Sequence, residues 1–306
     1  MRQFIARRLG YSLLSLLLLS LTIFFFVRVT GDPATLLVEP GASEEDIAAI
    51  HQQFGLDRPL WVQYGLFMLN LVRGDFGQSF YYQTPVLELY MNRLPNSLLL
   101  ASVAMAFSLL VGIPTGILAA VRVGRFWDSA GKLFALLGLS LPSFFVGLVM
   151  ILLFSVYLGW LPSSGSGTPL HLIMPAFALG WYFAASHMRL TRSSMLEVLG
   201  SEYVKLARLK GLPQALVIGK HAFKNALIPV LTLAGINLVL MINVAVVVET
   251  VFAWPGIGRL LYEGISFRDF PVVQGIVIMG GTMIVAVNLL VDVVYAVIDP
   301  RIRLEK

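Results

Sequence analysis

Long apolar runs separated by shorter polar intervals dominate the chain. Residues 9–29 form the first run, and others follow at about 98–121, 133–158, 172–190, 227–250 and 274–297. A helix that spans a bilayer needs ~20 mostly apolar residues, so each run is long enough to cross a membrane. The fourth run is the weakest, because Pro175, Gly180 and His187 interrupt it. The pattern therefore predicts an all-α, polytopic integral membrane protein with about six transmembrane helices.

The interval between the first two runs, residues 30–97, is polar with apolar patches at helical spacing. Ser43 precedes three acidic residues, a typical helix start, and residues 60–72 have amphipathic spacing. Glycines at 55 and 74 mark breaks. We predict an extracytoplasmic loop with short amphipathic helices on the membrane surface. Residues 1–306 are then expected to form a single transmembrane domain.

Composition supports the membrane interpretation. The 306 residues are 58% hydrophobic and 13% charged, with a mean hydropathy of +0.82. Soluble domains are roughly 45–50% apolar and about 25% charged. The net charge of +5 does not indicate a nucleic-acid partner here, because its distribution matters more than its sum. The chain has no cysteine, so it offers neither disulfides nor thiolate metal ligands.

The Lys and Arg residues fall mainly on one side of the predicted membrane. The N-terminus, the 122–132 loop, residues 189–224 and the C-terminus together carry 16 of the 22, whereas the other side carries 5 and Arg28 lies in the first run. By the positive-inside rule, both termini and the loop at 190–226 are expected in the cytoplasm.

That central loop contains a pattern suited to contact with another protein. Ala207 and Gly211 are four residues apart, which would place two small residues on one helical face. Gly211 can end the helix in a left-handed turn, and Pro213 cannot continue it. The segment resembles the cytoplasmic loop of ABC-importer permeases, in the variant of the dipeptide/oligopeptide/nickel family. The residues that carry this resemblance are Glu202, Tyr203, Ala207, Arg208, Lys210, Gly211 and Leu212.

Further segments extend the resemblance over nearly the whole chain. In the loop motif shared by ABC-importer permeases in general, Glu and Ala occupy the positions of Lys205 and Leu206. These two differences favour the peptide subfamily. Other family-like clusters are Gly31-Asp32-Pro33, Gly55-Leu56-Asp57, Gly74 to Ser79, Glu249 to Gly258, Asp269 to Gln274 and Asp299 to Arg303.

The resemblance implies a type I ABC-importer permease in a bacterial inner membrane, forming half of a path for di- or oligopeptides by alternating access. It also implies a second homologous permease, two ABC ATPase subunits that bind ATP and Mg, and an extracytoplasmic solute-binding protein. Gly219-Lys220 is followed by His221, and the chain contains no phosphate-binding P-loop. The chain itself is therefore expected to bind no cofactor and to be no enzyme.

Polar residues inside the runs are candidates for the solute path. Asn237 and Asn243 are costly in lipid, so each should face protein or water. These two residues either line the path or form hydrogen bonds between helices. The same alternatives apply to Asn288 and Asp292, which share a helix face. A second family-like segment contains a turn forced by Pro255-Gly256, and it suits the mouth of the path. The tentative path or gate residues are Asn237, Met241, Asn243, Glu249, Trp254 and Gly256.

Alternative functions differ in substrate or in energy source. Nickel-chelate and glutathione permeases belong to the same family. A secondary transporter would need ionisable residues near the midplane, and the runs offer Asp292 alone between their ends. Four histidines are scattered over both sides, so no metal site is expected.

Overall fold

The computed structural model describes residues 2–30 and 57–298, together with the isolated positions 43, 45, 48 and 52. Of residues 2–6, 30 and 290–298 it describes the backbone alone. The motifs at 31–33 and 299–303, and most of the helix start expected at Ser43, lie outside the described residues.

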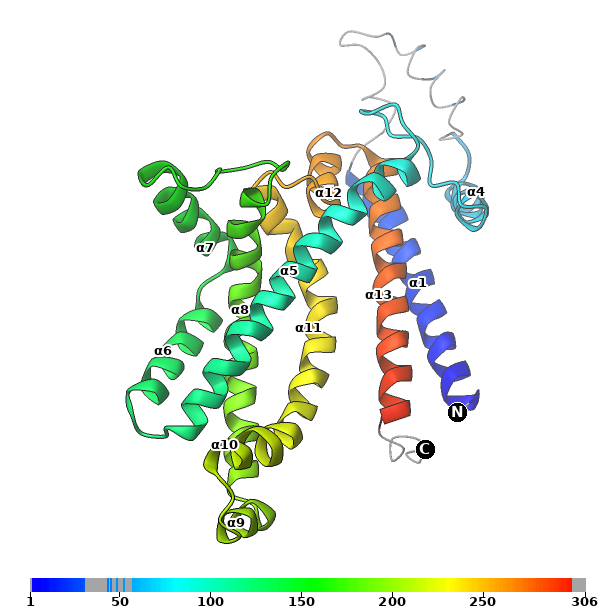
Figure 1. The fold of residues 1–306 in the computed structure, drawn as a ribbon. Helices are drawn as coiled ribbons and strands as arrows, with labels where there is room; N and C mark the ends of the chain where they lie inside the picture. Colours follow the sequence, from blue (N-terminus) through cyan, green and yellow to red (C-terminus); the bar gives the residue numbers. More distant parts are fainter. Residues whose placement is uncertain are drawn as a thin grey trace. The chain divides into compact units, whose positions relative to one another are not determined.

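The described residues are almost entirely helical (Figure 1). One isolated antiparallel bridge, between Gln78 and Pro85, is the only β pairing among them. The elements are α1 (Arg2–Thr30), α4 (Leu60–Val72), α5 (Val86–Val121), α6 (Phe126–Ser140), α7 (Ser143–Met150), the π-helix η1 (Ile151–Tyr157), α8 (Leu170–Leu199), α9 (Glu202–Leu209), α10 (Gln214–Leu216), the π-helix η2 (Val217–Phe223), α11 (Lys224–Val251), α12 (Ile257–Ser266) and α13 (Phe270–Ile298).

The chain divides into two compact units. Unit 1 comprises residues 1–95 and 259–306, and unit 2 comprises residues 96–258. The boundaries fall inside α5 and near the start of α12. The expectation of a single domain stays a prediction.

Unit 2 is built around α8, which packs against α6, α7 and α11. Small residues let the helix axes approach closely. A Cβ added at Gly112 of α5 would lie 2.6 Å from the Ala184 carbonyl oxygen, and one at Gly180 would lie 2.7 Å from the carbonyl oxygen of Ala104. These contacts between α5 and α8 require glycine, so the packing of unit 2 depends on backbone proximity as well as on side-chain burial.

The third apolar run is interrupted in its middle. The chain bends by 104° between α6 and the α7–η1 segment, with Leu141 and Pro142 in extended conformations at the bend. Pro142 has no N–H and cannot continue α6. The Leu141-Pro142 pair therefore ends α6 inside the third apolar run.

In unit 1, α1 pairs with α13, and α4 packs on α1. Ser20 and Tyr64 hydroxyls lie 3.0 Å apart, and the Arg28 Nε donates to Gln63 Oε1 at 3.0 Å. Arg28 thus makes its hydrogen bond within the unit, between α1 and α4. The helix predicted at residues 60–72 is confirmed as α4.

Length and composition identify the helices that can cross a membrane. Among the described residues, four helical stretches are long and apolar enough to cross a membrane, or five if the bent α6–α7–η1 pair is one span. α8, which covers the expected fourth span, falls short of this test, because His171, Pro175 and His187 lower the hydropathy of its first half. The predicted all-α, polytopic membrane architecture is thus confirmed, with four or five candidate spans among the described residues.

The helix of the second apolar run is longer than the run itself. α5 begins at Val86, so residues 86–97 continue this helix instead of forming a separate short one. Pro95 lies within this helix, where its ring removes one backbone hydrogen bond without ending the helix.

Candidate functional site

The helix α9 is anchored to unit 2 by a small apolar cluster. Val204 and Ala207 are buried and pack with Val217 of η2 and with Leu199 and Leu212 on either side of α9. Asn225 Nδ2 donates to the Tyr203 hydroxyl at 2.9 Å, which adds a polar tie to the start of α11. α9 therefore projects from the end of α8 as a helix with one buried face.

The burial of Ala207 corrects the predicted docking face. Ala207 is only 6% exposed, because its side chain lies against its own chain. It is not available to a partner. The opposite face carries Glu202, Lys205, Leu206 and Leu209, and Leu209 is 84% exposed. Large exposed apolar side chains on a helix with charged neighbours are typical of contact sites for other proteins.

Gly211 closes the segment in the left-handed region. Its φ is +72°, and its N–H donates to the carbonyl of Arg208 at 3.0 Å. The predicted left-handed turn at Gly211 is confirmed. A Cβ there would meet open space, so the requirement for glycine is one of backbone conformation. Arg208 and Lys210 are exposed beside it, and Leu212 is half-buried.

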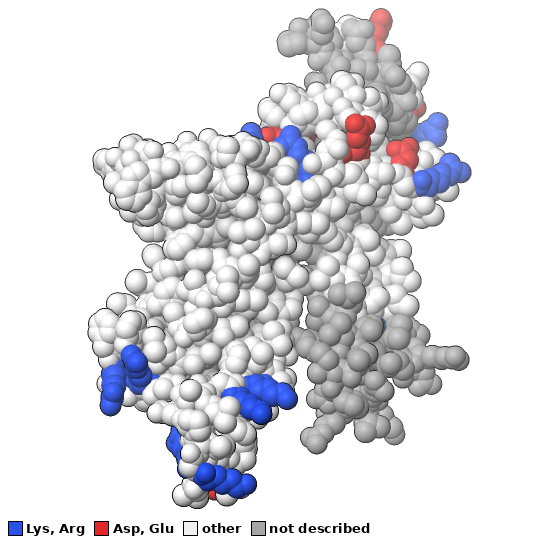
Figure 2. Space-filling view, viewed as in Figure 1, with Lys and Arg blue, Asp and Glu red and all other residues white. Residues whose placement is uncertain are grey.

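All ten Lys and Arg residues of unit 2 lie in the stretches 122–132 and 189–224. These stretches form the end of unit 2 that carries α9 and α10, where blue side chains gather in Figure 2. Unit 2 therefore has one strongly basic end, and α9 lies at that end.

A buried aspartate organises the basic end. Asp128 is fully buried at the start of α6 and accepts from Arg192 Nε at 2.7 Å, Lys132 Nζ at 2.9 Å and the Gly124 N–H at 3.0 Å. Because Arg192 belongs to α8, the carboxylate ties two helices together. Sequence reasoning missed this residue, although a lone Asp among the basic residues 122–132 was a visible signal.

A second buried carboxylate lies at the opposite end of α11. Glu249 is fully buried, and its side chain accepts from Ser97 Oγ at 2.6 Å and from the Gly258 N–H at 2.7 Å. Ser97 Oγ in turn accepts from the Ile257 N–H at 2.8 Å. A Cβ added at Gly256 would collide with the Glu249 carboxylate. The carboxylate therefore holds the 252–258 turn against the part of α5 that begins unit 2.

The same turn is fastened from its other side by Trp254 and Asn96. Trp254 is buried, and its Nε1 donates to the Asn96 carbonyl at 3.0 Å, while Asn96 Nδ2 donates to the Pro255 carbonyl at 2.9 Å. Ala253 has a φ of +48°, an uncommon value for a residue with a Cβ. We call Asn96, Ser97, Glu249, Trp254 and the 255–258 turn the Glu249 cluster.

The tentative path residues have mixed surroundings. Asn237, Met241, Glu249, Trp254 and Gly256 are buried inside unit 2. Asn243 is exposed, and its Nδ2 donates to the Val239 carbonyl at 3.2 Å. A side chain buried within one subunit can shape a path but does not touch the solute. Their role in a path or gate stays a prediction.

Asn237 makes a contact that the sequence left open. Its Nδ2 lies 3.2 Å from Nε2 of His187, and both side chains are buried between α11 and α8. The helix-to-helix interpretation therefore describes Asn237 in this structure. His187 was noticed in the sequence only as an interruption of an apolar run.

In unit 1, the structure brings together two of the family-like segments. Ser79 Oγ donates to Asp269 Oδ2 at 2.5 Å, and the Tyr81 N–H donates to the same oxygen at 3.0 Å. The Tyr81 ring stacks on Phe267 with centroids 4.0 Å apart. The segment after Gly74 and the turn between α12 and α13 thus form one surface, although they are 190 residues apart in sequence.

Tyr82 adds a charged partner to this surface. Its hydroxyl donates to Glu263 Oε2 at 2.7 Å, and Arg259 Nε donates to Glu263 Oε1 at 2.8 Å. Burial raises the pKa of Tyr82 to about 12, and the hydrogen bond to Glu263 contributes. The phenol therefore stays protonated and remains a donor at all physiological pH values.

None of these clusters has the geometry of an enzyme site or a metal site. No group of three or more His, Asp or Glu side chains able to hold a metal ion occurs among the described residues. The clusters instead join helix ends and loops, and α9 offers an outward face at a basic end. The described residues thus form a helical membrane protein whose exposed helix α9 lies at a basic end.

The family comparisons agree with that class. Residues 112–304 match the family described as binding-protein-dependent transport system inner membrane component, and residues 1–101 match the N-terminal family of the same transport systems. The chain belongs to this family. It is a permease subunit of an ABC importer with type I architecture, and the ATPase is a separate subunit. Such a permease works with a second permease, ATPase subunits and a binding protein.

Individual proteins show how far the similarity extends. Glutathione transport system permease proteins GsiC of Salmonella typhimurium and of Escherichia coli strain K12 are 40% and 38% identical to the chain over 304 residues, covering 99% of both sequences. Among solved structures, the MetNI methionine ABC transporter superposes with a TM-score of 0.56 and 19% identity, over 69% of this chain and 96% of that one. An amino acid ABC transporter superposes with a TM-score of 0.55 and 15% identity, over 68% of this chain and 92% of that one. These two structures support the fold alone.

Proposed function

We propose that the chain forms half of the path of an importer for small peptides, and that glutathione is the first substrate to test. The observation that carries this proposal is the full-length identity of 38–40% to glutathione permeases. Glutathione is a tripeptide, so it falls within the peptide class that the sequence motifs indicated. Other di- and oligopeptides and nickel chelates are the competitors within the family.

The complete transporter in this proposal pairs the chain with a second homologous permease. Two ABC ATPase subunits bind ATP and Mg, and an extracytoplasmic binding protein delivers the peptide. ATP binding closes the ATPases, and alternating access of the permeases follows. The absence of a P-loop in this sequence supports ATP binding by separate subunits.

We assign α9 as the element that docks on an ATPase. Its inner face is fixed by Val204 and Ala207, so a push on α9 reaches the end of α8 and η2 directly. Leu206 and Leu209 supply an exposed apolar contact, and Arg208 and Lys210 supply charge beside it. Gly211 sets the direction in which the chain leaves the helix.

The basic end of unit 2 supports a cytoplasmic position for α9, because Lys and Arg concentrate on the cytoplasmic side of membrane proteins. Both termini are then cytoplasmic, in a bacterial inner membrane. Reporters fused after Lys306 or near Pro213 should report cytoplasm, and one near Gln52 should report the outside. A cytoplasmic result at Gln52 would contradict this orientation.

Uptake by the reconstituted complex tests the substrate and the energy source together. Vesicles with the two permeases, the ATPases and loaded binding protein should accumulate labelled glutathione when ATP is present on the ATPase side. Collapse of ion gradients by an ionophore should leave uptake intact, whereas a secondary transporter would stop. Preference for a dipeptide or a nickel chelate in the same assay would refute the glutathione assignment and retain the importer.

A further inference from the structure

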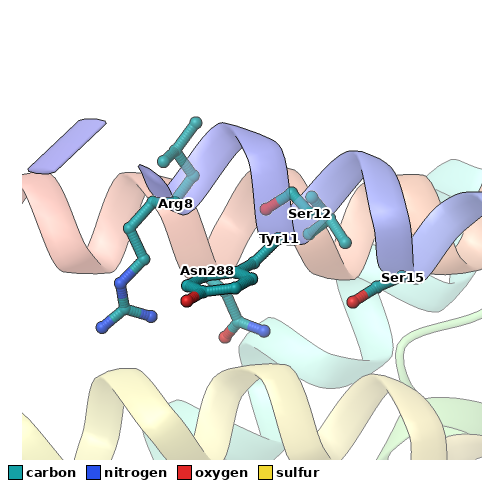
Figure 3. A pocket seen from close by; sticks show the side chains of 7 residues that line it. Arg8, Tyr11, Ser12, Ser15 and Asn288 are labelled. Carbon is teal, nitrogen blue, oxygen red and sulfur yellow. The ribbon is translucent and has the colours of Figure 1, made fainter. Parts of the chain in front are cut away.

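A polar groove lies between α1 and α13 of unit 1. It has a volume of about 260 Å³ and is lined by Arg8, Tyr11, Ser12, Ser15, Val285, Asn288 and Leu289. Figure 3 shows Arg8, Tyr11 and Asn288 projecting from the two helices at this place. We call these seven residues the α1–α13 groove.

The position of the groove along α1 sets its depth in a membrane. The spanning stretch of α1 starts at Arg7, so Arg8 lies where the chain enters the bilayer. Ser15 is seven residues further, about 10 Å along the helix axis. The headgroup layer is about 5–7 Å thick on each side of the hydrocarbon. The groove therefore extends from the headgroup layer to the first part of the acyl region.

Three polar side chains in the groove lack a hydrogen-bond partner in the described part of the chain. Further along the same helices, the Thr22 hydroxyl donates to the Leu18 carbonyl, and the Thr282 hydroxyl donates to the Ile278 carbonyl. Ser12, Ser15 and Asn288 make no such bond to any described residue. Polar groups at this depth are costly unless something accepts from them, which calls for an acceptor outside the described chain.

The end of the groove nearest the N-terminus, which lies in the headgroup layer, is basic. Arg7 Nε donates to the Tyr11 hydroxyl at 3.1 Å, and its guanidinium lies 5.6 Å from the centre of the Tyr11 ring. Tyr11 therefore keeps its own hydroxyl hydrogen for an acceptor, and Arg8 lies one turn away on the same groove. Basic pockets between transmembrane helices at the membrane surface suit the headgroups of anionic lipids.

We propose that the α1–α13 groove binds one anionic phospholipid. Arg8 and Tyr11 hold the phosphate, while Ser12, Ser15 and Asn288 donate to the ester carbonyls of the glycerol below it. Arg8 and Tyr11 lie at headgroup depth, and the three other polar residues lie at the depth of the ester carbonyls. A soluble anion would need only the first of these two layers. The site lies at a membrane interface whichever way the chain is inserted, and in the proposed orientation it faces the anionic cytoplasmic leaflet.

Native mass spectrometry of the purified permease complex, titrated with phosphatidylglycerol or phosphatidylethanolamine of equal chain length, tests the proposal. We expect one retained phosphatidylglycerol per chain and preference over the zwitterionic lipid. Arg8→Gln should weaken its retention about fivefold, the effect of roughly one interfacial cation. The wild type should retain ester-linked phosphatidylglycerol better than the ether-linked form, which has no carbonyl acceptors. Asn288→Leu should remove this preference. Arg73→Gln and Thr282→Val are the matched controls outside the groove, and both should retain lipid as the wild type does.

Several results would overturn the proposal. These are equal retention of the two lipids, unchanged retention in both groove variants, or displacement of the lipid by glycerol phosphate at equal concentration. A cross-link from Asn288→Cys to the second permease in the intact complex would likewise show a subunit interface in place of a lipid. Because the readout is bound lipid, failure of glutathione uptake leaves this test unaffected.

Discussion

The contact between Gly256 and Glu249 gives the sharpest test of how unit 2 is held together. In Gly256→Ala the new methyl collides with the Glu249 carboxylate. That carboxylate is fixed by Ser97 Oγ and the Gly258 N–H at 2.6 and 2.7 Å. Either the turn shifts, as in an overpacked core, at a cost of about 1–3 kcal/mol, or two bonds to a charged group weaken, each worth about 1.5–3 kcal/mol. The cheaper response sets the cost, so we expect about 1–3 kcal/mol.

The assay is thermal unfolding of the purified permease in detergent, followed by the loss of its monodisperse chromatographic peak. For a domain of 150–250 residues each kcal/mol lowers the Tm by roughly 2–4 °C, so Gly256→Ala should lose about 2–12 °C. Gly65→Ala is the matched control. A Cβ at Gly65 meets nothing within 4 Å, and Gly65 lies within α4, where alanine is the better helix former.

A double-mutant cycle separates this contact from a general effect on the turn. Glu249→Ala removes the group that the new methyl would meet, so Gly256→Ala should cost little in that background, and the two changes should be coupled by about 1–3 kcal/mol. A Gly256→Ala protein as stable as the Gly65→Ala control would refute the reasoning. Full additivity of Glu249→Ala and Gly256→Ala would do the same.

The remaining predictions concern the basic end and the energy source. Gly211→Val should weaken recovery of the ATPases in a pull-down, because a β-branched residue in the left-handed region costs about 1–2 kcal/mol, whereas Gly211→Asn should retain them; equal recovery of both variants would remove the conformational argument. Asp128→Ala should destabilise the permease by about 3 kcal/mol, because it leaves Arg192 unpaired beside a buried site. Lys132→Ala, which removes a 59% exposed partner of Asp128, should cost under about 1 kcal/mol in the same melting assay. The purified chain alone should hydrolyse no ATP, and activity that survives removal of all ATPase subunits would contradict this.

The sequence predicted the membrane class and the family, because both depend on local properties. Apolar run length decides whether a helix can span a bilayer, and it located α1, α5, α11 and α13 with few errors. The turn at Gly211 and the break at Leu141-Pro142 were also predictable, since they follow from backbone preferences of glycine and proline. The family motifs are contiguous, so they needed no tertiary information.

Burial and long-range contact could not be obtained from the same patterns. Ala207 and Gly211 had the spacing of a shared outer face, yet only the packing of Val217 against α9 decided that Ala207 faces inward. α8 was the weakest apolar run because its neighbours are other helices, so that close backbone contact replaces hydrophobicity along much of its length.

The two buried carboxylates show most clearly what only the tertiary structure decides. The sequence indicated Glu249 as a tentative path or gate residue, and it gave no role to Asp128 in the basic loop. Tertiary structure alone brings Ser97 to Glu249 across 152 positions and Arg192 to Asp128 across 64. A buried charge is stable only where donors converge on it, and that convergence is a property of the folded helices rather than of any one segment.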